Sequence, residues 1–264
     1  MSDQNKVTAA IVIIGDEILS GRTRDQNTSY IASHLSAIGI TLCEVRIVPD
    51  IETWIVDTVN SLRVQYDYVF TTGGIGPTHD DITADSIARA FDVAIDIDER
   101  ALDMMRKRYK EEDLQGERLR MARIPAGANL IDNSISHTPG FMLENVIVMA
   151  GIPDIMRVML DSVLPHLQSG QPFLTMTIRV IAPESQIAVP LKEVQKQFDD
   201  LTLGSYPFFE NNQLGAHLVL RSTNDTSLAA ARDLLMSKLR NDQLDPCIVE
   251  VSGGRDDVGE DLSE

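Results

Sequence analysis

The sequence contains few of the features that mark the common functional classes. Its only cysteines are Cys43 and Cys247, which excludes both a disulfide framework and a cysteine zinc cluster. Each lies in an apolar run that predicts a strand, so we expect both thiols to be buried. No stretch reaches the roughly 18–20 apolar residues that span a bilayer, and residues 1–6 lack the basic and apolar regions of a signal peptide. We therefore expect a cytoplasmic protein that does not contact membranes.

Basic residues are also scarce. The sequence has 23 Lys and Arg residues against 40 Asp and Glu, a formal net charge of −17, whereas proteins bind nucleic acid chiefly through Lys and Arg. There is no Gly-Lys-Ser phosphate loop, no nucleophile elbow and no Gly-x-Gly-x-x-Gly motif. These absences argue against nucleic-acid binding and against the most familiar hydrolases, NTPases and dehydrogenases. A small-molecule ligand is what we expect.

Apolar runs alternate with helical patterns over residues 1–170. Residues 9–14, 42–48 and 68–72 predict buried strands, and a segment with apolar residues at helical spacing follows each of them. The first of these helices is predicted over residues 27–38. Repeated strand-helix units indicate an α/β fold with a mostly parallel, doubly wound sheet.

The later part of this region is less regular. The second predicted helix carries Trp54 and Ile55, which we expect on its buried side. Residues 98–121 are rich in charges of both signs and predict a long solvated helix. Residues 141–150 indicate a hairpin or a bend, and residues 154–167 a further helix.

A different pattern begins after residue 170. Strands and helices in the order βαββαβ predict a smaller α+β domain of the ferredoxin-like type over residues 171–252, with its first helix over residues 191–198. Residues 253–264 are almost all polar or acidic and predict a disordered tail. The chain is thus expected to form two domains, residues 1–170 and 171–252.

The strongest functional signal lies in residues 68–83, which combine a buried strand, a glycine-rich turn, adjacent carboxylates and a helix start. Gly73, Gly74 and Gly76 lack a Cβ, so their backbone N–H groups can approach a phosphate closely. The helix that begins near residues 81–83 would direct its positive dipole end to the same place. The turn therefore predicts an anion site.

The carboxylates of Asp80 and Asp81 would repel a phosphate. Their presence implies a divalent cation between them and the ligand, and Mg²⁺ is the natural choice for oxygen ligands. The alternative is that the glycines only tighten a turn and the aspartates cap a helix. His79 is as well explained by a solvent-facing loop, and a metal-activated water needs no histidine base.

Acidic residues also follow the first two strands. Ligands of open α/β sheets bind at the carboxyl ends of the strands, so we expect Asp16, Asp50 and Asp81 to converge at one edge. Asp16 and Asp50 could instead cap helices or form turns, and Asn27 could either cap its helix or bind a ligand.

Two tight turns follow later in the chain. Pro139-Gly140 and Gly151-Ile152-Pro153 either bring backbone to a ligand or form plain loops.

These motifs together resemble a known family. The run Thr71-Thr72-Gly73-Gly74-Ile75-Gly76-Pro77-Thr78-His79-Asp80-Asp81-Ile82-Thr83, with Gly15-Asp16-Glu17-Ile18-Leu19, Gly21 and Asn27 upstream, resembles the molybdopterin-binding domain of MoaB and Mog proteins, most closely its variant in CinA-type competence/damage-inducible proteins. The resemblance covers roughly residues 7–170. Gly204-Ser205-Tyr206-Pro207 is similar to the KH-like module that follows in those proteins. Similar domains begin the eukaryotic FAD synthases.

The resemblance implies a function. The CinA-type branch, which alone matches Asp80, is associated with metal-dependent hydrolysis of ADP-ribose or FAD-like dinucleotides at the pyrophosphate bond. Adenylyl transfer to a pterin and non-catalytic binding of a pterin or nucleotide are the alternatives. Related domains self-associate, so a homo-oligomer is expected. The amidohydrolase domain of full-length CinA proteins has no counterpart in these 264 residues, so we expect its activity to be absent.

The predicted site has three groups of residues. The catalytic residues are Asp81, Asp80 and Asp50. The metal, Mg²⁺ or else Mn²⁺ or Co²⁺, is assigned to Asp81, Asp80, Asp16 and Asp50. The ligand-binding residues are Gly15, Asp16, Glu17, Asn27, Thr72, Gly73, Gly74, Gly76, Pro77, Thr78, Thr83, Pro139 and Gly140.

Overall fold

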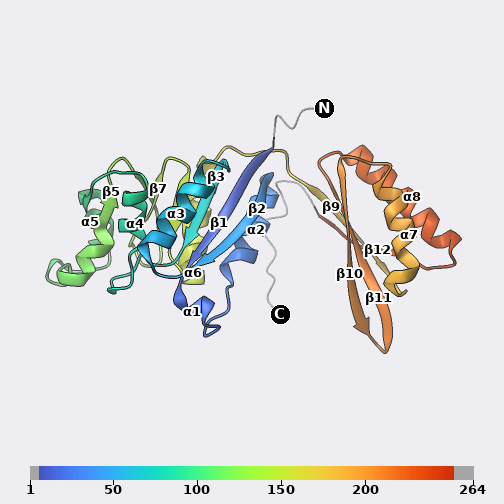
Figure 1. The fold of residues 1–264 in the computed structure, drawn as a ribbon, viewed down its shortest axis with the longest axis horizontal. Coiled ribbons are helices and arrows are strands. Elements are labelled where there is room, and N and C mark those ends of the chain that lie inside the picture. The colour runs from blue at the N-terminus through green and yellow to red at the C-terminus, as the bar shows by residue number, and fades with distance from the viewer. Residues whose placement is uncertain (1–5, 253–264) are drawn as a thin grey trace. The chain divides into compact units, whose positions relative to one another are not determined.

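The computed structural model describes residues 6–252, drawn in Figure 1. The chain divides into two compact units, one of Met1–Leu35 and Ile40–Gly170 and the other of Ser36–Gly39 and Gln171–Glu264. The acidic tail predicted at residues 253–264 lies outside the described residues. Within the described part of the chain, no helix is long and apolar enough to cross a membrane.

The first unit is built on a six-stranded sheet with the strand order β2-β1-β3-β8-β7-β6. These strands are β1 (Val7–Ile14), β2 (Ile40–Val48), β3 (Tyr68–Thr72), β6 (Asn129–Ile131), β7 (Gly140–Leu143) and β8 (Val146–Met149). β1 pairs in parallel with β2 and β3, and β3 pairs in parallel with β8. β7 and β6 complete the sheet in antiparallel fashion, so the predicted hairpin at residues 141–150 is present. The expected mostly parallel α/β sheet is confirmed.

A helix follows each of the first three parallel strands, as the sequence pattern predicts: α2 (Asn27–Ala37), α3 (Glu52–Arg63) and α4 (Thr83–Ala90) are these helices. The other helices of this unit are α1 (Asp16–Leu19), α5 (Glu99–Met105), α6 (Pro153–Val163) and the short 3-10 turns η1 (Glu111–Asp113), η2 (Gly116–Ala122) and η3 (Leu164–His166). A separate two-stranded ribbon joins β4 (Ile95–Ile97) to β5 (Arg123–Pro125). Figure 1 shows α3 beside β1 and β3, with α4 next to α3.

Burial explains why β1 reads as a continuous apolar run. Ala10, Val12 and Ile14 belong to the core cluster that also holds Ile55 of α3 and Ile87 of α4. Because strand side chains alternate between faces, the intervening residues of β1 point to the other face, and these too are buried. β1 is therefore covered on both sides, which a central parallel strand requires.

Helix α2 begins where its sequence supplies a cap. The Asp25 carboxylate accepts hydrogen bonds from the N–H groups of Asn27 (2.9 Å) and Thr28 (3.3 Å), which would otherwise lack partners. Ile31 and Leu35 are fully buried one turn apart. The capping role considered for Asn27 is therefore performed by Asp25.

Three predictions about side-chain environment were wrong. Trp54 is 58% exposed because it lies one position away from the buried stripe of α3, which includes Ile55 and Val59. Cys43 and Cys247 are both exposed. Each belongs to a strand at the edge of its sheet; exposed residues alternate along β2 from Cys43, whereas residues 247–251 of β12 are all exposed.

The long helix predicted over residues 98–121 is also absent. α5 ends after Met105, and the chain continues through η1 and η2. Leu114 and Ala122 are buried, so the chain folds back onto the core instead of projecting into solvent. Gly116 makes this possible because it adopts a positive φ of 55°.

The second unit contains the predicted βαββαβ order. Its elements are β9 (Leu174–Val180), α7 (Glu184–Gln195), β10 (Leu201–Glu210), β11 (Gln213–Ser222), α8 (Asp225–Asn241) and β12 (Cys247–Ser252). The strands form an antiparallel sheet in the order β10-β11-β9-β12. The position of the first helix was predicted wrongly: it was expected over residues 191–198, but α7 begins at Glu184. Pro190 lies inside this helix, where it is buried with Ile187 and Val194.

Candidate functional site

The loops after three parallel strands of the first unit border one cavity of about 550 Å³. Glu17 follows β1, residues 73–77 and Asp81 follow β3, and residues 150–153 follow β8. A cavity of this volume can hold a nucleotide-sized ligand. The predicted position of the site at the carboxyl edge of the sheet thus coincides with a real cavity.

Two parts of the glycine loop have different roles. Gly73 is packed against the sheet: its N–H donates to the Met149 carbonyl at 3.1 Å, and a Cβ at this position would lie 2.1 Å from the Ile14 carbonyl oxygen. Its N–H is therefore not free for a phosphate, contrary to the simplest form of our expectation. The N–H groups of Gly74, Ile75 and Gly76 make no hydrogen bond within residues 6–252, and all three residues line the cavity.

Thr83 braces this loop from behind. It is fully buried, its N–H donates to the Gly74 carbonyl at 2.9 Å and its hydroxyl donates to the Gly73 carbonyl at 2.9 Å. The first residue of α4 is thus engaged with the loop's own carbonyl oxygens. Thr72 is buried beside it at the end of β3, and its hydroxyl has no partner among residues 6–252.

Asp81 is held rigidly with one carboxylate oxygen free. Oδ2 accepts hydrogen bonds from the N–H (2.8 Å) and the hydroxyl (2.6 Å) of Thr78. The same oxygen would lie 2.6 Å from a Cβ at Gly76, so only glycine leaves room for this carboxylate. Oδ1 accepts no hydrogen bond from any residue the structure describes. That oxygen is available to a cation or a water.

Three further predicted acidic residues, Asp16, Asp50 and Asp80, are not among the residues that border the cavity or its adjoining recess. The Asp50 carboxylate accepts a hydrogen bond from the Asp16 N–H at 3.0 Å, so the loop after β2 supports the loop after β1. Partial burial raises the pKa of Asp50, and the nearby charges of Asp16, Glu17 and Asp80 raise it further. Accumulated negative charge of this kind favours a bound cation. His79, by contrast, is 97% exposed at its side chain.

The acidic groups do not form a complete metal cage. No group of at least three His, Cys, Asp or Glu side chains within residues 6–252 is arranged to hold a metal ion. Mg²⁺ is commonly bound through one or two carboxylates, with water and substrate phosphates as the other ligands. The carboxylate oxygen of Asp81 that accepts no hydrogen bond from the described residues fits a cation bound in that way.

We expect Asp50→Asn to raise the melting temperature at pH 7 by about 1–3 °C, a small change because water screens a half-exposed charge. A carboxyl whose pKa is raised by folding is ionised at neutral pH at a cost in stability, and it regains stability as the pH falls through its folded pKa. The advantage of the variant should therefore shrink toward pH 4. Thermal unfolding between pH 4 and pH 8 measures this difference. A lower melting temperature for the variant at pH 7 would contradict the electrostatic assignment.

The remaining predicted residues occupy several environments. Asn27 is buried, its amide donates to the Gly151 carbonyl at 2.9 Å, and its Oδ1 has no partner within the described part of the chain. Gly15 is buried and its N–H donates to the Val48 carbonyl at 3.2 Å. Pro139 borders a small recess beside the cavity, whereas Gly140 is packed in β7, where a Cβ would lie 2.5 Å from the Val148 carbonyl oxygen.

Several cavity residues were not predicted from the sequence. Tyr109, Met121, Ile155 and Met159 contribute an apolar wall, and Asn133, Ser136 and Thr138 contribute polar groups. Arg120 borders the adjoining recess. Most of these residues come from the irregular segment between α5 and β7. Its charged part predicted a solvated helix, so the sequence pattern did not indicate that this segment borders the cavity. The tight turn at Gly151-Ile152-Pro153, considered from the sequence, does line the cavity.

Comparison with known proteins assigns both units. The family model described as a probable molybdopterin binding domain matches residues 10–169, and the model described as the FAD synthase middle domain matches residues 172–246. The crystal structure of the protein CinA of Thermoplasma acidophilum, whose function is described as unknown, is 32% identical with a TM-score of 0.58 and covers 61% of this chain and 98% of that one.

Relatives also extend over most of the chain. A protein of Archaeoglobus fulgidus is 32% identical over 197 residues, which is 75% of this chain and 84% of the relative. A probable FAD synthase of Caenorhabditis briggsae is 28% identical over 265 residues, 90% of this chain. That alignment includes 51% of the nematode protein, so this chain spans about half its length.

Proposed function

Because the chain belongs to the molybdopterin-binding domain family, in its CinA-type branch, we propose that the cavity binds a dinucleotide and that a divalent cation assists hydrolysis of its pyrophosphate bond. ADP-ribose and FAD-like dinucleotides are the proposed substrates. One observation carries the proposal: the free N–H groups of residues 74–76 and the Asp81 carboxylate border the same cavity. Phosphate oxygens and a cation are the partners that these two kinds of group select.

The glycine loop provides the electrostatic part of the mechanism. The N–H groups of Gly74, Ile75 and Gly76 donate to the phosphoryl oxygens, on which negative charge accumulates as water attacks one phosphorus. Because α4 and Thr83 fix the loop beforehand, these donors need little rearrangement during the reaction. One preorganised donor of this kind contributes about 3–4 kcal/mol to barrier lowering.

The acidic residues provide the part of the mechanism that depends on a cation. Asp81, Asp80, Asp50 and Asp16 are the residues that would hold the cation, directly or through water. When bound, the cation would neutralise the diphosphate and lower the pKa of a water molecule. Thr78 keeps the Asp81 carboxylate in one orientation through two hydrogen bonds.

The apolar wall suits the base of the substrate. Tyr109 and Met121 of this wall border the cavity together with the glycine loop. Aromatic and thioether side chains contact flat heteroaromatic rings favourably. An adenine, isoalloxazine or pterin ring would therefore bind against this wall while the diphosphate lies at the loop.

We expect the purified chain to convert ADP-ribose to AMP and ribose 5-phosphate, or FAD to AMP and FMN, when Mg²⁺, Mn²⁺ or Co²⁺ is present. In each case one water is consumed and one bond to the bridging oxygen is broken. Chromatography with mass spectrometry identifies the products, and a reaction with EDTA is the control. Failure to release AMP from either substrate with all three metals would refute the proposed hydrolysis.

Adenylyl transfer to a pterin is the second candidate, favoured by the match to the molybdopterin-binding family model. A transferase requires an acceptor, whereas the hydrolase forms AMP without one. Binding of a pterin or nucleotide without turnover is the remaining alternative. We also propose that the chain forms a homo-oligomer, which light scattering coupled to size-exclusion chromatography would measure.

A further inference from the structure

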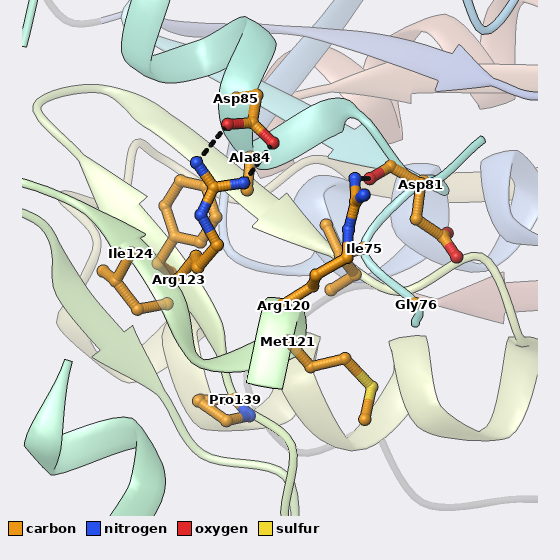
Figure 2. Close-up of a pocket in the computed structure, with 12 residues that line it drawn as sticks. Ile75, Gly76, Asp81, Ala84, Asp85, Arg120, Met121, Arg123, Ile124 and Pro139 are labelled. Carbon is orange, nitrogen blue, oxygen red and sulfur yellow. Dashed lines mark hydrogen bonds and ion pairs between the residues drawn. The ribbon is translucent and has the colours of Figure 1, made fainter. Parts of the chain in front are cut away.

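Two arginines border the small recess that adjoins the cavity, and they differ in how their charges are paired. Figure 2 shows the Arg123 guanidinium against the Asp85 carboxylate, with N–O distances of 2.6 and 2.8 Å. This bidentate ion pair satisfies the fork of Arg123. Arg123 is therefore engaged within the fold.

Arg120 has no such partner. Its Nη2 donates to the main-chain oxygen of Asp81 at 3.3 Å, a contact drawn in Figure 2, and the carboxylate of Glu117 is 3.9 Å from its Nη1. Its Nε is buried and has no hydrogen-bond partner among residues 6–252. A buried, unpaired donor of a charged group is costly, so its persistence points to a partner that the chain itself does not supply.

The location of Arg120 indicates what that partner is. The recess is bordered by Gly74, Gly76, Asp81 and Met121, all of which also line the large cavity. The charged residues that line the large cavity, Glu17 and Asp81, are both acidic. A guanidinium beside free backbone N–H groups matches a phosphate, because its planar fork can donate two parallel hydrogen bonds to phosphate oxygens.

We propose that Arg120 binds a phosphate group of the ligand and makes the site selective for nucleoside diphosphates and their esters over unphosphorylated nucleosides and pterins. This proposal rests on the proposed function for the identity of the substrate. Its contact with the Asp81 main chain places the guanidinium next to the loop that carries the free N–H groups.

The test measures binding without turnover. We would titrate ADP with Mg²⁺, and adenosine as the unphosphorylated probe, into the parent chain, Arg120→Gln and Arg120→Lys by calorimetry. Arg120→Gln should weaken ADP binding about 10- to 100-fold, the usual effect of losing hydrogen bonds to a charged group, and leave adenosine binding unchanged. The ADP affinity of Arg120→Lys should lie between those of the parent chain and Arg120→Gln, because lysine keeps the positive charge but lacks the planar pair of donors.

Arg89→Gln is the matched control. The Arg89 side chain is 66% exposed on α4 and pairs with Glu52 away from the recess, so its loss should not alter ADP affinity. Thermal unfolding of each variant separates loss of binding from loss of structure. If Arg120→Gln does not fold, the ADP affinity of Arg120→Lys tests the proposal in its place. Equal weakening of ADP and adenosine, unchanged ADP affinity, or a parent chain that does not bind ADP would each overturn the proposal.

The two proposals fail in different ways. If the parent chain binds ADP in an Arg120-dependent manner but releases no AMP from ADP-ribose or FAD, the hydrolase function fails and the role of Arg120 remains. If the parent chain hydrolyses these substrates and Arg120→Gln retains the same KM and ADP affinity, the role of Arg120 fails and the function remains.

Discussion

Replacing Asp81 with asparagine is expected to lower kcat/KM for dinucleotide hydrolysis at least about 100-fold, the size of effect seen when one preorganised electrostatic group is lost. Asparagine has nearly the same shape, and its amide oxygen can still accept the hydrogen bonds that Thr78 donates. What it lacks is the negative charge that would hold the cation. Initial rates with saturating Mg²⁺ measure the change.

Asp57→Asn is the control for Asp81→Asn. Asp57 is an exposed residue of α3 that does not line the cavity, so the same chemical change there should leave kcat/KM within about twofold of the parent value. Comparable activity of Asp81→Asn and the parent chain at matched Mg²⁺ would remove Asp81 from the mechanism. Circular dichroism confirms that both variants are folded.

The second large effect is on stability. Gly73→Ala should reduce the free energy of unfolding by about 3 kcal/mol or more, because it combines backbone strain with overpacking. Gly73 has a φ of 105°, and the new Cβ would lie 2.1 Å from the Ile14 main-chain oxygen. Strands β1 and β3 would have to separate locally to relieve this contact. Urea denaturation of the parent chain and the variant measures the difference.

Gly21→Ala separates the two contributions. Gly21 also has a positive φ, 70°, but nothing lies within 4 Å of the position its Cβ would take. Gly21→Ala should therefore lower the free energy of unfolding through backbone strain alone, by about 1 kcal/mol. If both variants lose the same stability, the close approach to Ile14 does not limit this position.

The elements that the sequence predicted well are those whose burial follows one local pattern, either a continuous apolar run or apolar residues at helical spacing. β3 was predicted at residues 68–72 and is found there, because a short apolar run ends at a glycine turn. α2 was predicted over residues 27–38 and extends from Asn27 to Ala37, since its apolar residues recur at helical spacing. The spacing of apolar residues is enough to predict an element when that spacing alone determines which residues are buried.

Prediction failed where contacts between residues far apart in the sequence determine the local structure. The charged residues 98–121 look like a solvated helix, but burial of Leu114 and Ala122 against the core bends the segment into short turns. Those turns carry Arg120 to within hydrogen-bonding distance of Asp81, 39 positions earlier in the chain. No spacing rule connects two such residues, so the sequence could indicate the acidic and glycine-rich parts of the candidate site but not its arginine or its apolar wall.

The support beneath the glycine loop has a consequence for how the binding surface forms. The Gly73 N–H bonds to Met149 at the end of β8, and Asn27 bonds to Gly151 just beyond it. Because β8 is the last parallel strand of the first unit's sheet in chain order, a polypeptide emerging during synthesis lacks this support until that strand has docked. A nucleotide that binds only the completed surface would stabilise the native state by mass action. Its protective effect against proteolysis would then report whether α2, β3 and β8 are packed together in the first unit.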